Sequence, residues 1–506
     1  MESVPVPPRI FVFLTGASVM ATEMCASRFI APWFGSSMIV WSVLISVVMA
    51  AMSLGYWYGG RLADRKPRWD ILYMLPVITG VFISLIPFAG RMIFSGLSAG
   101  IRGTPVNIIV LSLAGILIVF VPPVFVLAMV SPFTVKLLAK AENTGRTAGS
   151  LYAVSTLGSI AGTLLPSLVT IPLLGTKETM FLSSAILILL GSSGLQGKKK
   201  LAILSVLLPL TGWLISGHAV KPGVNVAHEE ESIYQYLQVQ RLENGSTRLV
   251  VNEGGAMQSI ARENDRLNPA STYYESYLML PYMLEKPDSA RVLVIGAGAG
   301  TIPHWLAVHV RPALNGLEID AVEIDRRATE LGYEWFGSAP EDAEVFTADG
   351  RMYLSATEEK YDVIITDTYS NQVYIPFHMT TEEYFSQVRN HLNPGGILAV
   401  NVNGLNENSE LVQSMGRTVG SVFSNSYIFQ PGGAWNFMIM ASDTPLTAPP
   451  ADSFPSWNPV LEHTAFLMER DFKPFNAESG MLLTDNRAPV EFMTDQMILG
   501  EVTGYN

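Results

Sequence analysis

Cysteine is nearly absent from this chain of 506 residues, in which Cys25 stands alone. A single thiol cannot form a disulfide within the chain. It also excludes a metal site built from several cysteines, such as a structural zinc cluster. Cysteine usage therefore says nothing about the redox compartment in which the protein works.

Acidic residues are scarce in the first part of the chain. Residues 1–217 contain 6 Asp and Glu against 15 Lys and Arg, a net charge of +9, whereas residues 218–506 contain 38 against 17, a net charge of −21. Parts of a chain that differ this much in charge usually occupy different environments. The length also predicts two or three domains, because single cores rarely exceed about 250–300 residues.

Long apolar runs fill the first part. A helix needs roughly 20 mostly apolar residues to cross a bilayer, and seven segments approach that length: 10–30, 37–60, 71–90, 106–130, 150–174, 178–194 and 201–217. Pro122-Pro123 should kink the fourth segment. The first run continues past Arg9 without a small-residue cleavage site, so we interpret it as a membrane helix. We predict an all-α bundle of seven transmembrane helices over residues 1–220.

Lys and Arg are distributed unevenly over the short loops of this bundle. Three lie on one side, at Arg91, Arg102 and Lys177, and ten lie on the other: Arg61, Arg65, Lys66, Arg68, Lys136, Lys140, Arg146 and Lys198 to Lys200. Positively charged loops stay in the cytoplasm. The bias predicts a multi-pass protein of the plasma (inner) membrane with a cytoplasmic N-terminus. Seven crossings would then place the C-terminal part outside the cytoplasm.

Residues 228–265 alternate between apolar and polar side chains, a pattern typical of antiparallel strands. The segments 233–239 and 248–252 show the alternation, and the turn residues Glu243-Asn244-Gly245 separate them. We predict a small antiparallel β-sheet here. A larger domain should follow over residues 266–506, beginning with a helix near 271–284.

A glycine-rich turn follows the first buried strand of that larger domain. The strand at 291–295 runs directly into Gly296-Ala297-Gly298-Ala299-Gly300, and a helical segment comes next. A strand, a glycine loop and a helix let a nucleotide-sized ligand approach the backbone closely. A second strand, 319–325, carries Glu323 at the position that holds ribose hydroxyls, and Asp325 suits a helix cap. The pattern predicts a Rossmann-like, nucleoside-binding α/β fold.

Two further turns of this domain carry carboxylates. Asp349 follows the third strand and is placed to reach the edge of an adenine ring, and Asp367 ends the fourth strand, 361–366. Ligands of open α/β sheets bind at the carboxyl ends of the strands. Each carboxylate alone could be a helix cap or a solvated loop residue. Together, the four turns indicate one nucleoside site.

These motifs resemble those of the spermidine synthase (polyamine aminopropyltransferase) family over nearly all of residues 230–495, and in particular its membrane-fused branch. The glycine loop, Glu323 and Asp349 are similar to the nucleoside-binding turns of the family, and residues 361–367 resemble the strand that ends in its catalytic aspartate. Further similar segments are Gly254 to Gln258, Tyr273-Tyr274-Glu275, Ile375 to His378, Leu483 to Glu491 and, in the membrane part, Gly55 to Arg65.

The resemblance implies a role for individual residues. Asp367 would deprotonate an attacking amine, with Tyr273 or Tyr369 beside it. The residues implied to bind the donor are Gln258, Gly296, Gly298, Gly300, Glu323 and Asp349. Those implied to bind the acceptor are Tyr274, Glu275, Ser370 and His378. No metal is implied.

Two positions depart from the family pattern. Ala299 and Ser370 stand where the family has acidic residues that hold cationic amine groups. The donor expected from the resemblance is therefore decarboxylated S-adenosylmethionine or S-adenosylmethionine itself, as a co-substrate. The acceptor is a polyamine, or an amine on a lipid or a membrane partner.

The function predicted is that of a membrane-integrated transferase, which moves an aminopropyl or related alkyl group from a sulfonium donor to an amine. One alternative is an S-adenosylmethionine-dependent methyltransferase. Another is a non-catalytic sensor or transporter that binds a polyamine or a nucleoside. The expected partners are the lipid bilayer and the amine, without nucleic acid, and the sequence leaves a homodimer open.

The charge bias places the C-terminal part outside the cytoplasm, whereas the implied donor is made in the cytoplasm. The two expectations conflict. The conflict disappears if segment 201–217, which contains Pro209, does not span the membrane. The soluble part would then lie in the cytoplasm.

Overall fold

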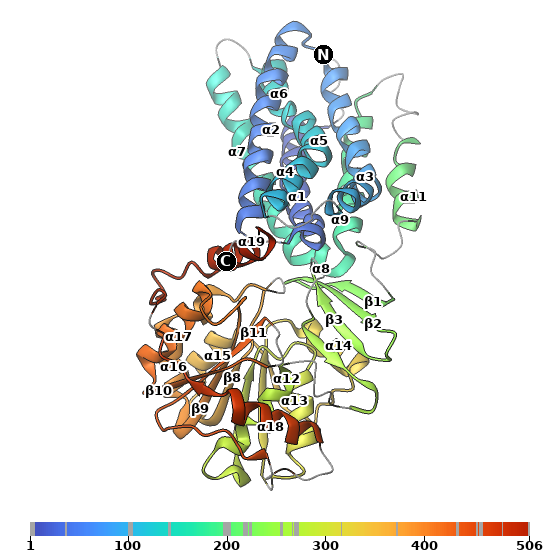
Figure 1. The fold of residues 1–506 in the computed structure, drawn as a ribbon. Helices are drawn as coiled ribbons and strands as arrows, with labels where there is room; N and C mark the ends of the chain where they lie inside the picture. Colours follow the sequence, from blue (N-terminus) through green and yellow to red (C-terminus); the bar gives the residue numbers. More distant parts are fainter. Residues whose placement is uncertain are drawn as a thin grey trace. The chain divides into compact units, whose positions relative to one another are not determined.

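The computed structural model describes residues 6–35, 38–99, 105–139, 143–195, 204–215, 221, 225–252, 257–265, 267, 273–314, 316–370, 373–431, 435–451, 454, 459–477 and 479–503. The chain forms two compact units (Figure 1). The helical unit comprises Met1–Gly223 and Glu229–Tyr236, and the α/β unit comprises Val224–His228 and Leu237–Asn506.

The helical unit is built from long apolar helices with small residues where they approach one another. Its helices are α1 (Pro8–Phe34), α2 (Met38–Arg65), α3 (Trp69–Ala99), α4 (Pro105–Val119), α5 (Val121–Ala128), α6 (Val130–Leu138), α7 (Thr144–Leu165), α8 (Ile171–Leu174), α9 (Thr176–Ser192) and α11 (Leu207–Ile215). A π-helical turn, Pro166–Thr170, joins α7 to α8. Gly158 and Gly162 of α7 lie against the backbone of α1, where a Cβ on Gly162 would sit 2.0 Å from the Ala17 carbonyl oxygen.

Five helical segments in the described residues are long and apolar enough to cross a membrane, so the expectation of seven was wrong. They are Pro8–Phe34, Met38–Arg65, Trp69–Leu97, Val121–Leu138 and Thr144–Leu174. The helix breaks near the Pro122-Pro123 pair that was expected to kink it, because proline lacks the N–H that continues a helix. This leaves the short apolar helix Val110–Val119 before the break.

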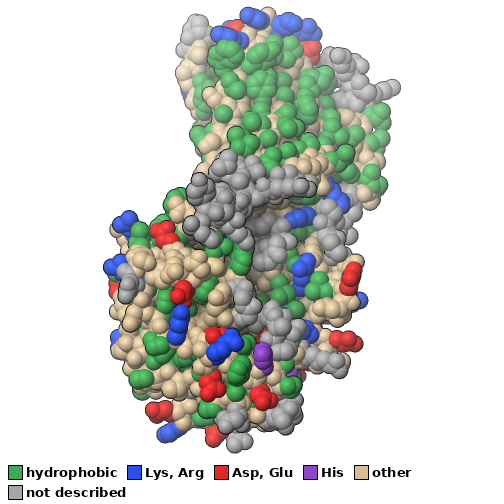
Figure 2. Space-filling model, viewed as in Figure 1, with side chains coloured by type: hydrophobic (Ala, Val, Ile, Leu, Met, Phe, Trp, Pro, Cys, Tyr) green, Lys and Arg blue, Asp and Glu red, His purple; other side chains and the backbone are tan. Residues whose placement is uncertain are grey.

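The expected span 178–194 is found as a helix of the same length, shifted by two residues, whereas the described part of 201–217 contains a shorter helix. Residues 201–203 and 216–217 lie outside the described part. Helix α9 has 17 residues and α11 has nine. The apolar character of the helical unit remains clear on its surface, where hydrophobic side chains form a broad area and Lys and Arg gather at one end (Figure 2).

An eight-stranded sheet organises the α/β unit. Its order is β12-β10-β11-β9-β8-β5-β6-β7. The strands are β5 (Arg291–Ile295), β6 (Glu318–Glu323), β7 (Glu344–Thr347), β8 (Tyr361–Thr366), β9 (Leu392–Asn403), β10 (Asn425–Phe429), β11 (Asn436–Ser442) and β12 (Lys473–Pro474). Strands β5 to β9 run parallel, with Ile295 opposite Val322 on one side and Thr366 on the other. Strands β11, β10 and β12 extend the sheet in antiparallel pairings.

The buried strand β5 contributes to a core on each face of this sheet. Val292 and Val294 pack in one core with α12 (Tyr274–Tyr277), α13 (Thr301–Trp305) and α18 (Pro459–Asp471). Leu293 and Ile295 pack in the other with α15 (Gly350–Ala356), α16 (Glu382–Asn390), α17 (Glu410–Val422) and α19 (Val490–Thr503). This alternation is why a central parallel strand is apolar at every position.

A second, four-stranded sheet has the order β1-β2-β3-β4. Its strands are β1 (Val226–Glu231), β2 (Tyr236–Arg241), β3 (Thr247–Val251) and β4 (Ser259–Ala261), and β3 pairs antiparallel with both β2 and β4. The predicted turn is present, with Gly245 at a φ of 81° between β2 and β3. The antiparallel sheet expected over 228–265 is therefore found.

The helix expected near 271–284 is found only as two short pieces. The described residues form α12 and a 3-10 turn, Leu280–Met283, because Pro281 interrupts the helical hydrogen bonds. Residues 271 and 272 lie outside the described part.

Candidate active site

The sheet reverses its direction of growth at the neighbouring strands β5 and β8. From β5 the chain proceeds outward to β6 and β7, and it then returns to place β8 on the opposite side of β5. Ligands of open α/β sheets bind outside the carboxyl ends of the strands at such a switch point. The turns after β5 and β8 are the glycine loop and the segment that begins with Asp367, so these two predicted turns meet there.

The glycine loop needs its glycines for both conformation and space. Gly296, Gly298 and Gly300 have φ values of 90°, 56° and 86°, a region that favours glycine. A Cβ on Gly296 would lie 2.3 Å from the carbonyl oxygen of Asp367. The loop therefore packs its backbone directly against the segment that carries Asp367.

Glu323 ends β6 and holds the glycine loop. Its Oε2 accepts a hydrogen bond of 2.7 Å from the Gly298 N–H, and its Oε1 accepts one of 2.9 Å from Asp325. Burial raises the pKa of the Glu323 carboxyl to about 7. Asp325 caps α14 (Arg326–Trp335) by accepting from the Arg327 N–H, as the sequence predicted.

Asp349 is both a helix cap and a partner of His378. One carboxylate oxygen accepts from the Met352 N–H at the start of α15, and the other lies 3.1 Å from His378 Nε2. The predicted donor-side residue Asp349 and the predicted acceptor-side residue His378 are thus joined directly, which the sequence did not indicate.

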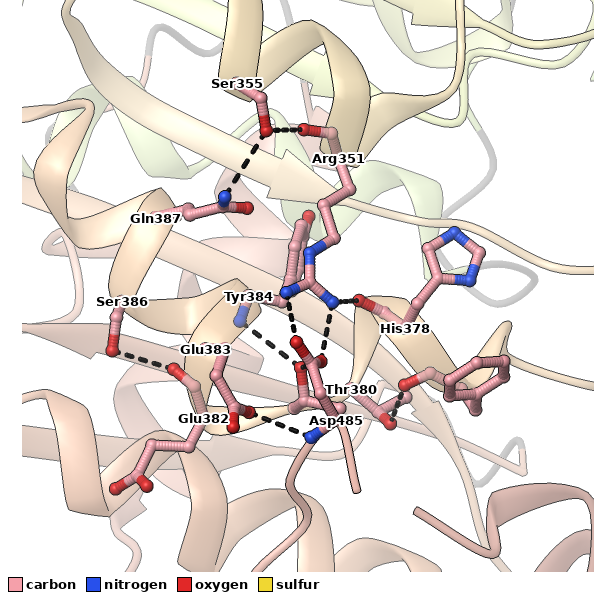
Figure 3. Close-up of polar contacts among 12 residues, drawn as sticks. Arg351, Ser355, His378, Thr380, Glu382, Glu383, Tyr384, Ser386, Gln387 and Asp485 are labelled. Carbon is pink, nitrogen blue, oxygen red and sulfur yellow. Dashed lines mark hydrogen bonds and ion pairs between the residues drawn. The ribbon is translucent and has the colours of Figure 1, made fainter. Parts of the chain in front are cut away.

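An ion pair on α15 fixes the segment that carries His378 (Figure 3). Arg351 donates to the carbonyl oxygen of His378 at 3.0 Å and makes two bonds of 2.6 Å to Asp485. Thr381 donates to the same carboxylate at 2.8 Å. Asp485 belongs to the 483–491 segment noted in the sequence, and its contact explains how that distant segment supports this edge of the sheet.

Asp367 is held by a polar network that the sequence analysis missed. Asn401 of β9 donates to its Oδ1 at 3.0 Å, and Asn436 of β11 donates to the side-chain oxygen of Asn401 at 3.0 Å. This arrangement turns the Asn401 amide so that its NH₂ faces the carboxylate. Burial raises the pKa of Asp367 to about 6, although hydrogen bonds from Asn401 and Tyr273 lower it.

The predicted tyrosines and Gln258 lie around this carboxylate. Tyr369 donates through its hydroxyl to the Asn401 carbonyl oxygen at 3.0 Å. Gln258 Nε2 lies 3.5 Å from the Tyr369 carbonyl oxygen. The Tyr274 hydroxyl donates to the Gln258 carbonyl oxygen at 3.0 Å. The Gln258 turn, Tyr273 and the Asp367 segment are therefore brought together, whereas Gly254 to Ala256 of that turn lie outside the described residues.

Three predicted acceptor residues contact protein groups in this structure. Tyr274 is 2% exposed, and its ring packs edge-on against Trp305. Glu275, also 2% exposed, forms an ion pair of 2.8 Å with Arg262. The Ser370 hydroxyl donates to the Tyr374 carbonyl oxygen. Tyr274 and Glu275 therefore support the site from within the core.

A small hollow also borders the glycine loop. Pro303, His304, Tyr333 and Asp342 line its other walls. Its described lining includes none of Glu323, Asp349 and Asp367.

The strand order and the switch point define the class of the second unit as an α/β domain with an open, mostly parallel sheet. A family model described as "Spermine/spermidine synthase domain" matches residues 271–446. A probable polyamine aminopropyl transferase of Bifidobacterium longum is 33% identical over 329 residues, covering 60% of this chain and 69% of that protein. The chain therefore belongs to the spermidine synthase-like, polyamine aminopropyltransferase family and is a transferase enzyme.

Other relatives are more distant. A polyamine aminopropyltransferase of Vibrio vulnificus is 27% identical over 226 residues, covering 44% of this chain and 73% of that protein. The crystal structure of a probable spermidine synthase from Corynebacterium glutamicum has a TM-score of 0.36 at 20% identity, covering 44% of this chain and 81% of that chain. The family assignment rests on the sequence relatives.

Proposed function

We propose that the protein transfers an aminopropyl group from decarboxylated S-adenosylmethionine to an amine at the carboxyl ends of β5, β6 and β8. The observation that carries the proposal is the environment of Asp367. A carboxylate with a pKa of about 6, oriented by Asn401 and placed against the glycine loop, suits a general base near neutral pH. Membership of the aminopropyltransferase family supports the same chemistry.

The reaction is a single displacement. The lone pair of the amine nitrogen attacks the aminopropyl carbon bonded to the positively charged sulfur. The carbon–sulfur bond breaks, its electron pair stays on sulfur, and neutral methylthioadenosine leaves. The proton lost by the amine passes to Asp367, and Glu323 and Asp349 hold the ribose and the adenine of the donor. Alignment of the nitrogen, the carbon and the sulfur supplies much of the rate.

The membrane bundle would keep this domain on the cytoplasmic side. Helix α9, with 17 residues, is about 26 Å long and comes close to the roughly 30 Å of a bilayer core, whereas the nine described residues of α11 reach about 14 Å. The five long apolar helices and α9 make six crossings. With the positively charged loops inside, the C-terminal unit then returns to the cytoplasm, where sulfonium donors are made.

The nucleoside product tests the proposal. Purified full-length protein is incubated with a short diamine and either decarboxylated or intact S-adenosylmethionine. We expect methylthioadenosine from the decarboxylated donor and no S-adenosylhomocysteine from the intact one. S-adenosylhomocysteine formed from the intact donor would instead show a methyltransferase. No product from either donor would contradict aminopropyl transfer to the diamine.

A further inference from the structure

The backbone pairs with itself shortly after Asp367. Ser370 and Tyr374 form an antiparallel bridge, in which the Ser370 N–H donates to the Tyr374 carbonyl oxygen at 2.7 Å and the Tyr374 N–H donates to the Ser370 carbonyl oxygen at 3.1 Å. Ile375, the next residue, is 2% exposed and packs in the core on one face of the sheet. The Ser370–Tyr374 bridge therefore links Asp367 to the point where this segment is anchored in the core.

Strand β9 holds the part of this segment that is nearest to Asp367. The Asn401 side chain donates to the Asp367 carboxylate, and the Asn401 carbonyl oxygen accepts from the Tyr369 hydroxyl, both at 3.0 Å. Farther along, the Asn403 side-chain nitrogen lies 3.5 Å from the Val373 carbonyl oxygen, which is at the limit of a hydrogen bond. The contacts from β9 therefore weaken toward the bridge.

The bridge itself is held by a contact from the C-terminal helix α19. The Tyr374 hydroxyl donates to Asp495 Oδ1 at 2.7 Å, and both side chains are partly buried. Burial raises the pKa of the Asp495 carboxyl, and the hydrogen bond from Tyr374 lowers it in part. A hydrogen bond to a charged carboxylate is stronger than one between neutral groups. The bond to Asp495 is thus shorter and stronger than the nearest contact from β9.

We infer that Asp495 is a positioning residue of the transfer site, which holds the segment after Asp367 through Tyr374. This inference rests on the proposed function. Attack in line with the breaking bond requires the amine, the donor carbon and the base to keep their relative positions, and a displacement of about 1 Å can lower the rate about a hundredfold. The C-terminal part of the chain would then fix two turns of the site, the turn after β7 through Asp485 and Arg351 and the turn after β8 through Asp495.

Hydrogen exchange of the ligand-free full chain tests whether Asp495 holds the bridge. Tyr374→Phe and Asp495→Ala should each speed exchange of the amides at positions 370 and 374 several-fold, resolved by fragmentation in the mass spectrometer. The double variant should exchange no faster than either single variant, because both changes remove the same bond. Unchanged exchange at these two amides in both single variants overturns the inference.

The matched control is Tyr361→Phe. It also removes a tyrosine–aspartate hydrogen bond, the bond of 2.8 Å from the buried Tyr361 hydroxyl to Asp320 at the opposite end of β8 from Asp367. This variant should leave exchange at positions 370 and 374 unchanged. Equal acceleration in the control would show a general loss of stability and would overturn the inference.

Turnover then tests whether the contact serves the reaction. With saturating decarboxylated S-adenosylmethionine, Tyr374→Phe and Asp495→Ala should lower kcat by about tenfold, while methylthioadenosine affinity stays within a few-fold of wild type. Asp495→Asn keeps an oxygen that accepts from Tyr374 and should restore most of the rate. A kcat that is unchanged in both variants, or lowered equally by Tyr361→Phe, overturns the inference. Because exchange needs no turnover, a wild type that protects the two amides but forms no product contradicts the proposed function alone.

Discussion

At the scale of single residues, the carboxylates at the strand ends could be predicted from the sequence. Each of them stands at the end of a strand in a chain that repeats strand, turn and helix. Glu323 ends β6, and Asp367 directly follows β8, as expected. The network that orients Asp367 was missed, because Asn401 and Asn436 come from β9 and β11. Only the sheet order makes those strands neighbours, and no local pattern encodes it.

Replacement of Asp367 by Asn should separate transfer from binding. The amide keeps the shape and loses the basicity, so the transfer rate should fall by about 10²–10⁴, the usual contribution of a general base. Methylthioadenosine affinity, measured by calorimetry, should stay within a few-fold of wild type. In the wild type, the rate should rise with pH through about 6 as the carboxyl ionises. Wild-type turnover in the variant would remove Asp367 from the mechanism.

Glu323 should make stability depend on pH. Its pKa is raised from 4.5 to about 7 in the folded state, so the folded protein binds more protons than the unfolded chain between those values. The stability it contributes is therefore lost as pH rises through this window, by up to about 3 kcal/mol. Glu323→Gln should reduce the dependence of the melting temperature on pH between pH 4.5 and 7. An unchanged slope would mean that Glu323 is ionised throughout.

At the scale of elements, the parallel strands were predicted closely and the helices less well. Strands β5 and β8 were expected at 291–295 and 361–366, where they are found, because continuous apolar runs bounded by polar turns are distinctive. The fourth apolar stretch failed as a single helix because hydropathy averages over the Pro122-Pro123 break. Prolines set helix ends that composition alone does not show.

The contact between α15 and the 483–491 segment should matter for nucleoside binding. Asp485→Asn removes the charge that holds Arg351, and Arg351 anchors His378 beside Asp349. We expect methylthioadenosine affinity to fall several-fold, since the lost pair is partly exposed and of modest strength. Asp443→Asn is the matched control, because Asp443 pairs with Arg389 at 2.8 Å away from these residues. Equal affinities in the two variants would show that the anchor does not reach the nucleoside.

At the scale of the whole molecule, composition predicted an apolar, positively charged part and an acidic α/β part, and the chain forms a helical unit and an α/β unit. The number of crossings could not be predicted in the same way, because hydropathy counted 201–217 as a span and its described residues form a helix of only nine residues. If α9 crosses the membrane and α11 does not, the α/β unit lies on the cytoplasmic side and not outside. That side agrees both with the charge of the loops and with the cytoplasmic supply of the donor.

Cysteine labelling decides on which side of the membrane the α/β unit lies. The exposed Glu358 of the α/β unit is changed to Cys in a Cys25→Ser background, which removes the chain's own thiol. A membrane-impermeant thiol reagent should label this variant only after the cells are lysed. Labelling of intact cells would place the domain outside, as seven crossings require.

Aminopropyl transfer with Asp367 as the base changes the mass of the acceptor amine. The most direct measurement is mass spectrometry of the amine after incubation of full-length wild type and Asp367→Asn with decarboxylated S-adenosylmethionine. We predict a gain of one aminopropyl group with the wild type and at most trace product with the variant. An amine that gains a methyl group, stays unmodified, or is modified equally by both proteins would contradict the account.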